Sequence, residues 1–373
     1  MRRKRHNNRP IYRTLGTGLV AVLAITASAC SSSTSSSSTS PNSNSSTSTS
    51  QGSTSPTSQQ TVAVSISMSP ASFTSLTQYV AMDMGYLSKL GIQANRVYSS
   101  SCTFTFGLLV AGKLDFGACD IPAMILASQA AHTQMQVAVG LEHRYPAALV
   151  CRKGIGITAS YPQGIKDLVG KNIESSAPAS QDTADVLMSL EANGYNINSV
   201  HWVYISGGAG DVVAALDAGR IDCGVVFQPT QTELGNSVET VINIQDGDTA
   251  PIVNSAPFTS LNVTASYASA NPTTIAKVQE AMAEADAFIG NPANASAVAK
   301  GVQKEFPSVS LSLLTKLVQE LAPTYESGST ITQAQFDASL EVYNKEAAAG
   351  VAGITSPLGS LKYSQWVLPI SSS

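Results

Sequence analysis

The sequence lacks the short motifs that mark several classes of enzyme and metalloprotein. No G-x-S-x-G, S-x-x-K or H-E-x-x-H occurs, so the usual signatures of serine hydrolases, penicillin-binding enzymes and zinc proteases are missing. No C-x-x-C occurs either, and His132, His143 and His201 are scattered, which argues against a metal site. The glycine-rich turn at 207–210 lacks both the full G-x-G-x-x-G pattern and a P-loop lysine. We therefore expect no cofactor.

Positive charge is scarce after the N-terminal region. Six of the 21 Lys and Arg residues lie within residues 1–29, which leaves 15 against 25 Asp and Glu. The resulting net charge of about −10 argues against a nucleic-acid partner and against electrostatic binding to anionic lipid. About 310 residues follow position 60, enough to bury a sizeable core, and this length favours two lobes over one.

The N-terminal region has the parts of a secretory signal peptide, predicted over residues 1–29. A basic run precedes an apolar stretch from Leu15 to Ala27, and small residues follow up to Cys30. The stretch is shorter than the roughly 20 apolar residues of a membrane-spanning helix, and no later stretch is long enough. Ordinary cleavage after Ala29 is one interpretation. We favour a bacterial lipobox, which the segment resembles although alanine stands where leucine is commoner. Cys30 would then be lipidated and would anchor the protein at the outer face of the cytoplasmic membrane.

Residues 31–60 contain no charged and no aromatic residue and consist almost wholly of Ser, Thr, Pro, Asn and Gln. Such a segment cannot bury enough apolar surface to fold. Residues 30–60 are therefore predicted to form a disordered tether that spans on the order of 30 Å and holds a folded domain clear of the membrane.

Four cysteines remain beyond Cys30: Cys102, Cys119, Cys151 and Cys223. An exported chain meets an oxidising compartment, and four cysteines permit two disulfides in three connectivities. Cys102 and Cys119 lie in neighbouring strand–helix units and form the first candidate pair. The alternative is that the cysteines are buried free thiols.

Short strand patterns alternate with helical patterns after residue 61. Strands are predicted at 62–66, 92–98, 114–118, 135–141, 147–151, 171–175, 200–205, 221–227, 238–244 and 260–265. Helices are predicted at 72–87, 103–111, after Pro122, and at 182–192, 212–218, 272–289, 293–304, 310–320 and 332–348. This order predicts an α/β fold of two lobes, each a mostly parallel sheet flanked by helices, with extra C-terminal helices.

One helix-to-strand turn occurs twice. The segment 109–117, Leu-Val-Ala-Gly-Lys-Leu-Asp-Phe-Gly, returns at 216–224 as Leu-Asp-Ala-Gly-Arg-Ile-Asp-Cys-Gly. In each copy a glycine, Gly112 or Gly219, is placed to end a helix with a positive φ, and a buried strand begins after the basic residue. The constant offset predicts two lobes built alike. The alternative is that any such turn uses these residue types.

Several segments resemble the solute-binding proteins of ABC importers, in the group that serves nitrate, sulfonates, taurine and the pyrimidine precursor of thiamine. They are Ala81–Leu87 with Gly91-Ile92, Ala111–Gly117, Asp167–Lys171 and Ala218–Asp222. The resemblance covers residues 61–290 and implies a type II periplasmic-binding-protein fold. By that resemblance, 61–150 plus 255–373 form lobe one and 151–254 form lobe two, with hinge crossings at Lys153–Gly156 and at 250–257. It also implies a monomer that delivers a small molecule to a membrane permease.

The candidate binding site follows from this architecture. In open α/β sheets ligands bind beyond the C-terminal ends of the strands, where helix N-termini present free N–H groups. The loops at these ends are 67–72, 99–103, 119–122, 176–183, 206–211 and 227–229. The candidate ligand-binding residues are Ser69, Phe73, Ser101, Thr103, Asp120, Ser176, Ser180, Asp182, Ser206, Gly207, Asp211 and Phe227. A ligand that touches both lobes would favour a closed form. Any single serine among them is explained as well by capping a helix.

The charge of the ligand is the point at which the resemblance and the residues disagree. Nitrate and sulfonates are anions, but the predicted loops carry Asp120, Asp182 and Asp211 and no Lys or Arg. Two like charges about 4 Å apart repel by roughly 4 kcal/mol at an effective dielectric constant near 20. This repulsion exceeds the favourable interaction of an anion with a helix N-terminus. We therefore expect an uncharged or zwitterionic organic ligand, taurine-like or pyrimidine-like. Its N–H or ammonium group would be received by Asp120, with Phe73 or Phe227 as an apolar wall.

Two other function classes stay open at this point. An enzyme on the same fold, of the pyrimidine-precursor-synthesising type, is one, with Glu142-His143-Arg144 as an acid–base cluster; a solvated charged turn is the simpler interpretation of that cluster. A surface scaffold that does not transport is the other, since the Ser/Thr-rich tether fits it.

Overall fold

The computed structural model describes residues 61–99, 101–177, 180–196, 198–325, 329–351, 354 and 357–370. The predicted signal peptide, Cys30 and the tether lie outside this part of the chain. Within it, no helix combines the length and apolar character needed to cross a membrane.

The first lobe is built on five strands. They are β1 (Val62–Met68), β2 (Ile92–Tyr98), β3 (Gly117–Cys119), β4 (Met135–Gly140) and β10 (Ser260–Thr264). β1 and β2 pair in parallel along their full length, and an isolated bridge joins β1 to the residue before β3. β10 lies between β3 and β4 and runs antiparallel to both.

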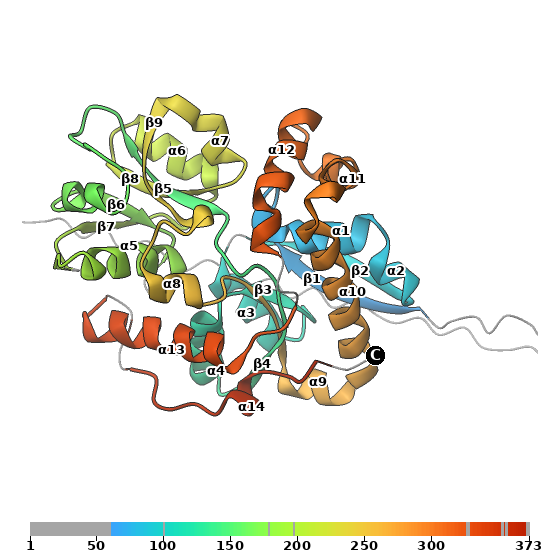
Figure 1. Ribbon diagram of the computed structural model, residues 1–373. Helices are drawn as coiled ribbons and strands as arrows, with labels where there is room; N and C mark the ends of the chain where they lie inside the picture. Colours follow the sequence, from blue (N-terminus) through green and yellow to red (C-terminus); the bar gives the residue numbers. More distant parts are fainter. Residues whose placement is uncertain are drawn as a thin grey trace, which may run out of the picture. The chain divides into compact units, whose positions relative to one another are not determined.

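Helices cover both faces of this lobe (Figure 1). They are α1 (Leu76–Asp83), α2 (Tyr86–Lys89), α3 (Cys102–Val110), α4 (Ile121–Ala131), α9 (Ala265–Ala270), α10 (Pro272–Gly290), α11 (Ala295–Val302) and α12 (Leu311–Leu321). α1, α10, α11 and α12 contribute to one apolar core with β1 and β10, and α3 and α4 contribute to a second core on the other side. The lobe is therefore a three-layer α/β unit.

The second lobe contains a five-stranded sheet in the order β7-β6-β8-β5-β9. Its elements are β5 (Ala147–Arg152), β6 (Asn172–Ser175), β7 (His201–Tyr204), β8 (Cys223–Phe227), β9 (Val238–Asn243), α5 (Gln181–Ala192), α6 (Ala209–Asp217), α7 (Thr230–Leu234) and α8 (Pro251–Ser255). β7, β6 and β8 are parallel, whereas β5 is antiparallel to β8 and to β9.

The α/β class, the flanking helices and the mostly parallel sheets are confirmed, and each lobe contains one strand that runs against the others. The reversed strands are those next to the passages between lobes: β5 begins just after the chain leaves the first lobe, and β10 begins just after it returns. A strand that arrives from the neighbouring lobe has no crossover helix to turn it round, so it inserts antiparallel.

The two passages between the lobes run side by side at 141–146 and 256–259. The Leu141 N–H donates to the Thr259 carbonyl at 2.9 Å, and the Phe258 N–H donates to the Glu142 carbonyl at 3.1 Å. The first passage thus comes earlier than the expected Lys153–Gly156, which forms a turn after β5 inside the second lobe. The glycines of that turn serve the strand connection and not the hinge.

The repeated turn has the same structure in both lobes. α3 and α6 are each followed by a glycine in the left-handed region, Gly112 at φ 63° and Gly219 at φ 67°. The aspartate after it ties the turn to a neighbouring strand: Asp115 Oδ2 accepts the Ser65 N–H at 2.7 Å, and Asp222 Oδ2 accepts the Asn172 N–H at 2.9 Å. The duplicated sequence therefore encodes a duplicated junction.

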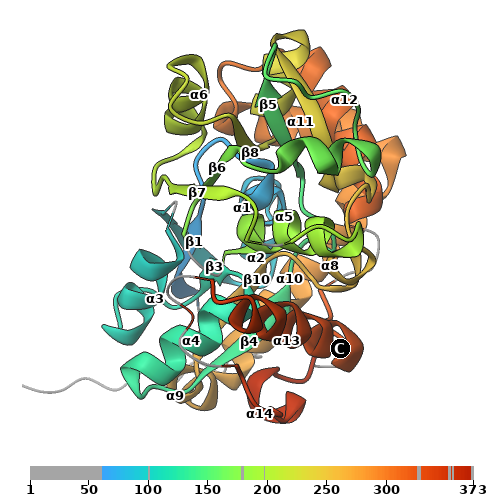
Figure 2. The same ribbon diagram turned by 90° about the vertical axis from the view of Figure 1, so that its left-hand side faces the viewer.

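A C-terminal helix joins the two lobes. α13 (Gln333–Ala348) begins in a capping box at Thr332 and packs on α4 of the first lobe and on α5 and α8 of the second (Figure 2). Val342 shares an apolar cluster with Leu187 and Val253, and Lys345 pairs with Glu191 at 3.2 Å. The chain then adds the short α14 (Tyr363–Trp366) against β4.

Candidate ligand-binding cleft

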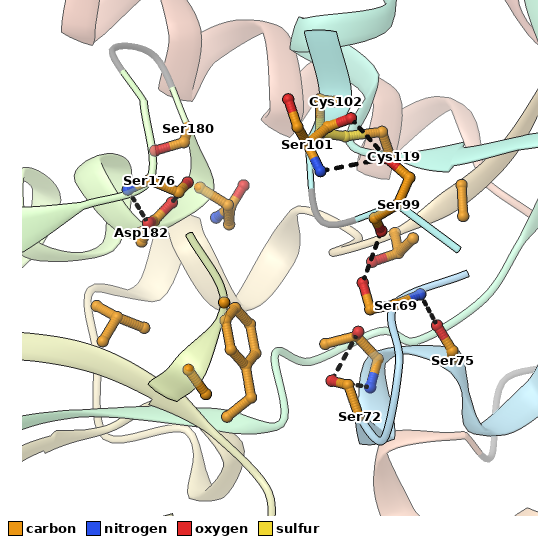
Figure 3. Close-up of a pocket in the computed structure, with 18 of the residues that line it drawn as sticks. Ser69, Ser72, Ser75, Ser99, Ser101, Cys102, Cys119, Ser176, Ser180 and Asp182 are labelled. Atoms are coloured by element: carbon orange, nitrogen blue, oxygen red, sulfur yellow. Dashed lines mark hydrogen bonds between the residues drawn. A yellow bond between two sulfur atoms is a disulfide. The ribbon is translucent and has the colours of Figure 1, made fainter. Parts of the chain in front are cut away.

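A cavity of about 230 Å³ lies between the two lobes at the ends of their strands. All six loops expected around the site contribute to its lining. Figure 3 shows Ser69, Ser99 and Ser101 on one side of the space and Ser176, Ser180 and Asp182 on the other. A molecule in this cavity would touch both lobes.

Eight of the twelve candidate residues line this cavity. They are Ser69, Ser101, Asp120, Ser176, Ser180, Asp182, Gly207 and Phe227. Thr103 and Ser206 lie instead on a neighbouring groove along α3 and α4. Phe73 and Asp211 line neither hollow.

Phe73 and Asp211 are outside the cavity for different reasons. The Phe73 side chain is fully buried in the core of the first lobe, with its ring 5.2 Å from that of Phe306, so it cannot form the expected apolar wall. Only its backbone faces the other lobe, where its N–H donates to the Gln228 carbonyl at 3.2 Å. Asp211 lies in the first turn of α6, exposed to solvent and against Gly207.

Hydroxyl groups form the wall of the first lobe and hold one another in place. The Ser75 hydroxyl accepts the Ser69 N–H at 2.8 Å, and the Thr105 hydroxyl donates to Ser99 at 2.9 Å. The Ser101 hydroxyl caps α3 by accepting the Phe104 N–H. Ser101 is thus a helix cap and a lining residue at once.

Asp120 is the acidic group of the first-lobe wall. Its Oδ1 caps α4 by accepting the Ala123 N–H at 2.7 Å. The structure pairs Cys102 with Cys119, with Cα atoms 5.7 Å apart, and Oδ2 of Asp120 faces these two sulfurs. Because a disulfide carries no proton, neither sulfur donates a hydrogen bond to this oxygen. Burial raises the pKa of Asp120 to about 6.

The acidic groups of the second lobe behave differently from each other. The carboxyl oxygens of Asp182 accept the Ser176 N–H at 2.7 Å and the Ser176 hydroxyl at 3.1 Å, so both oxygens close the loop that precedes α5.

Glu174 was not among the expected site residues. It is 2% exposed, accepts the Val225 N–H at 3.2 Å, and has its pKa raised to about 9 by burial and by the Asp182 charge. At neutral pH Glu174 is therefore a carboxylic acid that can donate a hydrogen bond.

Aromatic rings close one side of the cavity next to the passages between lobes. The Tyr145 ring stacks on Phe258 with centroids 3.7 Å apart and meets Phe227 edge-on at 4.9 Å. All three residues line the cavity. Phe227 thus lies where an apolar wall was expected, and Tyr145 and Phe258 extend it.

Acidic residues surround the cavity, and no basic residue is among those that line it. Behind Asp182, the carboxyl groups of Asp185 and Glu346 are buried, and burial raises the pKa of both well above the usual range. A metal ion has no clear donor set here, because Cys102 and Cys119, the sulfurs close to Asp120, are joined to each other. The site is suited to groups that donate hydrogen bonds or carry positive charge.

The cluster Glu142-His143-Arg144 lies in the first passage between the lobes. Glu142 is 1% exposed, so it is not part of a solvated turn. Burial raises its pKa well above the usual range. The His143 ring is within 2.6 Å of the Gln335 amide on α13. None of the three lines the main cavity.

The second disulfide lies away from the cavity. Cys151 and Cys223 stand opposite each other on β5 and β8, with Cα atoms 4.0 Å apart. Among described residues the four cysteines beyond Cys30 are thus all paired.

Solved structures with the same fold include two named binding proteins and one named enzyme. The alkanesulfonate-binding protein SsuA from Xanthomonas axonopodis pv. citri, bound to MOPS, is 14% identical with a TM-score of 0.59, over 78% of this chain and 92% of that chain. The nitrate-binding protein NrtA from Synechocystis PCC 6803 is 12% identical with a TM-score of 0.60, over 79% and 83%. The desulfurization enzyme DSZB is 16% identical with a TM-score of 0.54, over 82% and 96%. Identities this low establish a periplasmic-binding-protein-like fold and nothing finer.

A comparison with curated proteins found no match. A family model described as NMT1-like matches residues 43–303, which is more than half of the chain and includes every residue of the cavity lining. The chain therefore belongs to the NMT1-like family.

Proposed function

We propose that this protein is an extracytoplasmic solute-binding protein of an ABC importer. It would capture a small organic molecule in the cleft, close around it by a hinge motion and deliver it to a permease. The observation that carries the proposal is a cavity lined by loops from both lobes, beside two adjacent chain passages that can serve as the hinge. A ligand that contacts both walls stabilises the closed form by its differential affinity for that form.

The chemistry of the lining suggests an uncharged or zwitterionic ligand, taurine-like or pyrimidine-like. Asp120 offers a buried carboxyl group, Glu174 offers an acidic proton, and Phe227 offers an apolar face. An ammonium or ring N–H would meet Asp120, and a neutral carbonyl or ring nitrogen would meet Glu174. A simple anion would lie among carboxyl groups, at a cost of about 4 kcal/mol per close like charge, which helix N-termini return only in part.

We also propose that the protein is a monomer anchored through lipid on Cys30, with residues 30–60 as its tether. Two acyl chains on one cysteine give the two signals that stable anchoring requires. An anchored binding protein stays close to the permease that it serves.

An enzyme remains the second candidate, because DSZB shares the fold. The described residues that line the cavity supply carboxyl groups, hydroxyl groups and Tyr145, but no histidine, lysine or free thiol. This set suits recognition through hydrogen bonds better than nucleophilic catalysis.

Mass spectrometry of the small molecules that co-purify with the protein tests the proposed function directly. Calorimetry would then compare the wild type with Asp120→Asn, which keeps a capping side chain at α4 but removes the charge. Asp211→Asn is the matched control, because Asp211 lies outside the cavity. We expect Asp120→Asn to weaken an amine or zwitterion at least tenfold and Asp211→Asn to leave it unchanged. Tight binding of nitrate or an alkanesulfonate, unweakened in Asp120→Asn, would contradict the proposed ligand class, and chemical conversion of the ligand would favour the enzyme.

A further inference from the structure

A second hollow of about 630 Å³ runs along α3 and α4 next to the cleft. The two hollows are adjacent, since Ser101, Cys102, Asp120, Ser176 and Ser180 line both. The larger hollow therefore begins at the polar end of the binding site.

The walls of this α3–α4 groove are mostly apolar. Along the two helices they include Phe106, Gly107, Val110, Ala123, Leu126 and Ala127. The spacing of three and four residues places each set on one helical face. Gly107 is exposed, and a Cβ built on it would have no atom within 4 Å, so there is free space where a side chain is missing.

Asp120 provides an independent sign of a ligand at the junction of the two hollows. Its side chain is 8% exposed and lines both hollows, and one oxygen faces the Cys102–Cys119 disulfide, which has no proton to donate. A ligand that donates a hydrogen bond to a buried carboxyl group stabilises it. A polar group placed there would leave the rest of its molecule facing the groove.

The sizes of the two hollows favour one molecule that occupies both. The cleft alone, at about 230 Å³, is smaller than the roughly 300–1,000 Å³ pockets that hold drug-sized ligands, whereas the groove is within that range. The tether of this chain is a poor occupant, because residues 31–60 contain no apolar side chain apart from proline.

We propose that the ligand is an amphiphile. Its N–H or ammonium head lies in the cleft at Asp120, and its unbranched apolar tail lies in the α3–α4 groove. This rests on the proposed solute-binding function and adds the shape of the substrate to it.

The test uses two series of probes with unbranched tails of four to ten carbons, the 1-alkylamines and the neutral 1-alkanols, titrated into the wild type and Gly107→Trp. A tryptophan at position 107 fills the groove without touching the cleft. Phe104→Trp is the matched control, because Phe104 lies on the same helix, is exposed and lines neither hollow. Thermal unfolding of each variant confirms that it is folded.

We expect the Kd of each probe for the wild-type protein to fall about twofold to fourfold for each added methylene, in both series. Gly107→Trp should abolish this dependence on chain length but leave the butyl probes unaffected, and Phe104→Trp should behave as the wild type. Amines should bind more tightly than alkanols of equal length, and Asp120→Asn should remove that preference.

The remaining outcomes separate the groove from the cleft. If short amines bind but chain length has no effect, or Gly107→Trp shows the same dependence as the wild type, the groove proposal is wrong and the cleft proposal stands. If chain length matters and Gly107→Trp abolishes the effect, but amines show no preference that depends on Asp120, the groove is supported and the proposed head-group site fails. If no probe binds, the groove proposal and the cleft proposal are both wrong. If cells that carry Gly107→Trp no longer take up the probes, although the purified variant binds them as the wild type does, the proposal is overturned. The groove would then be assigned to contact with the permease.

Discussion

Replacing Glu174 by glutamine should stabilise the ligand-free protein at neutral and higher pH. Burial raises the pKa of Glu174 from 4.5 to about 9, so folding must take up a proton at any pH between these values. The stability that the protonated form contributes is fully present below pH 4.5 and is lost as the pH rises toward 9. Each pH unit in this window corresponds to about 1.4 kcal/mol, hence about 3 kcal/mol between pH 5 and pH 7. Glutamine keeps the carbonyl that accepts the Val225 N–H and has no proton to take up.

Urea unfolding at half-unit steps from pH 5 to pH 9 measures this effect as a difference between wild type and Glu174→Gln. The difference should be small at pH 5 and should widen steadily in favour of the variant. Glu341→Gln changes an exposed glutamate on α13 and should give a curve parallel to the wild type. Parallel curves for Glu174→Gln as well would show that Glu174 is ionised in the folded protein, and the account of the cleft as a site with a neutral acid would fall.

Three further predictions concern packing, anchoring and closure. Gly224→Ala should cost about 1–3 kcal/mol in urea unfolding, because the new Cβ would lie 2.7 Å from the stiff Val212 side chain of α6; an unchanged midpoint would show that the helix can move away. Cys30→Ser should release the protein from the membrane fraction or stall its processing, and a variant that is cleaved normally and stays bound would rule out lipidation. Small-angle scattering should give a smaller radius of gyration at saturating ligand, and an equal radius would remove hinge closure while leaving binding intact.

The duplicated turn is the reason that so much of the fold could be predicted from the sequence. Gly112 and Gly219 mark helix ends, and a buried strand follows each of them, so the two lobes and most of their strands followed from local patterns. The loops around the cleft followed in turn, since the C-terminal ends of strands are fixed once the strands are known. The direction of β5 and β10 could not be predicted in this way, because strand direction depends on which lobe a segment joins, and no local pattern indicates this.

Individual side chains at the site were harder to predict than loops. Phe73 lies in a cleft loop by sequence, but the core of the first lobe holds its ring next to Phe306. Glu174 lies inside a strand and was overlooked, although a glutamate in a buried strand pattern is itself a signal of an unusual site. Tyr145 belongs to a passage between lobes, where it meets Phe227 and Phe258 only after both lobes have folded. Contacts of this kind join distant parts of the chain, so the spacing of residues along the sequence does not predict them.

The position of α13 limits the ways in which the lobes can move. Two adjacent passages, 141–146 and 256–259, would by themselves leave the lobes free to twist as well as to bend. α13 contacts α4 on one side and α5 and α8 on the other, and twisting would shear both contacts at once. Rotation about an axis close to α13 disturbs them least, so we expect a single degree of freedom. Closure would then bring the same residues to the same places each time, which lets a few donors and acceptors act as a selective site.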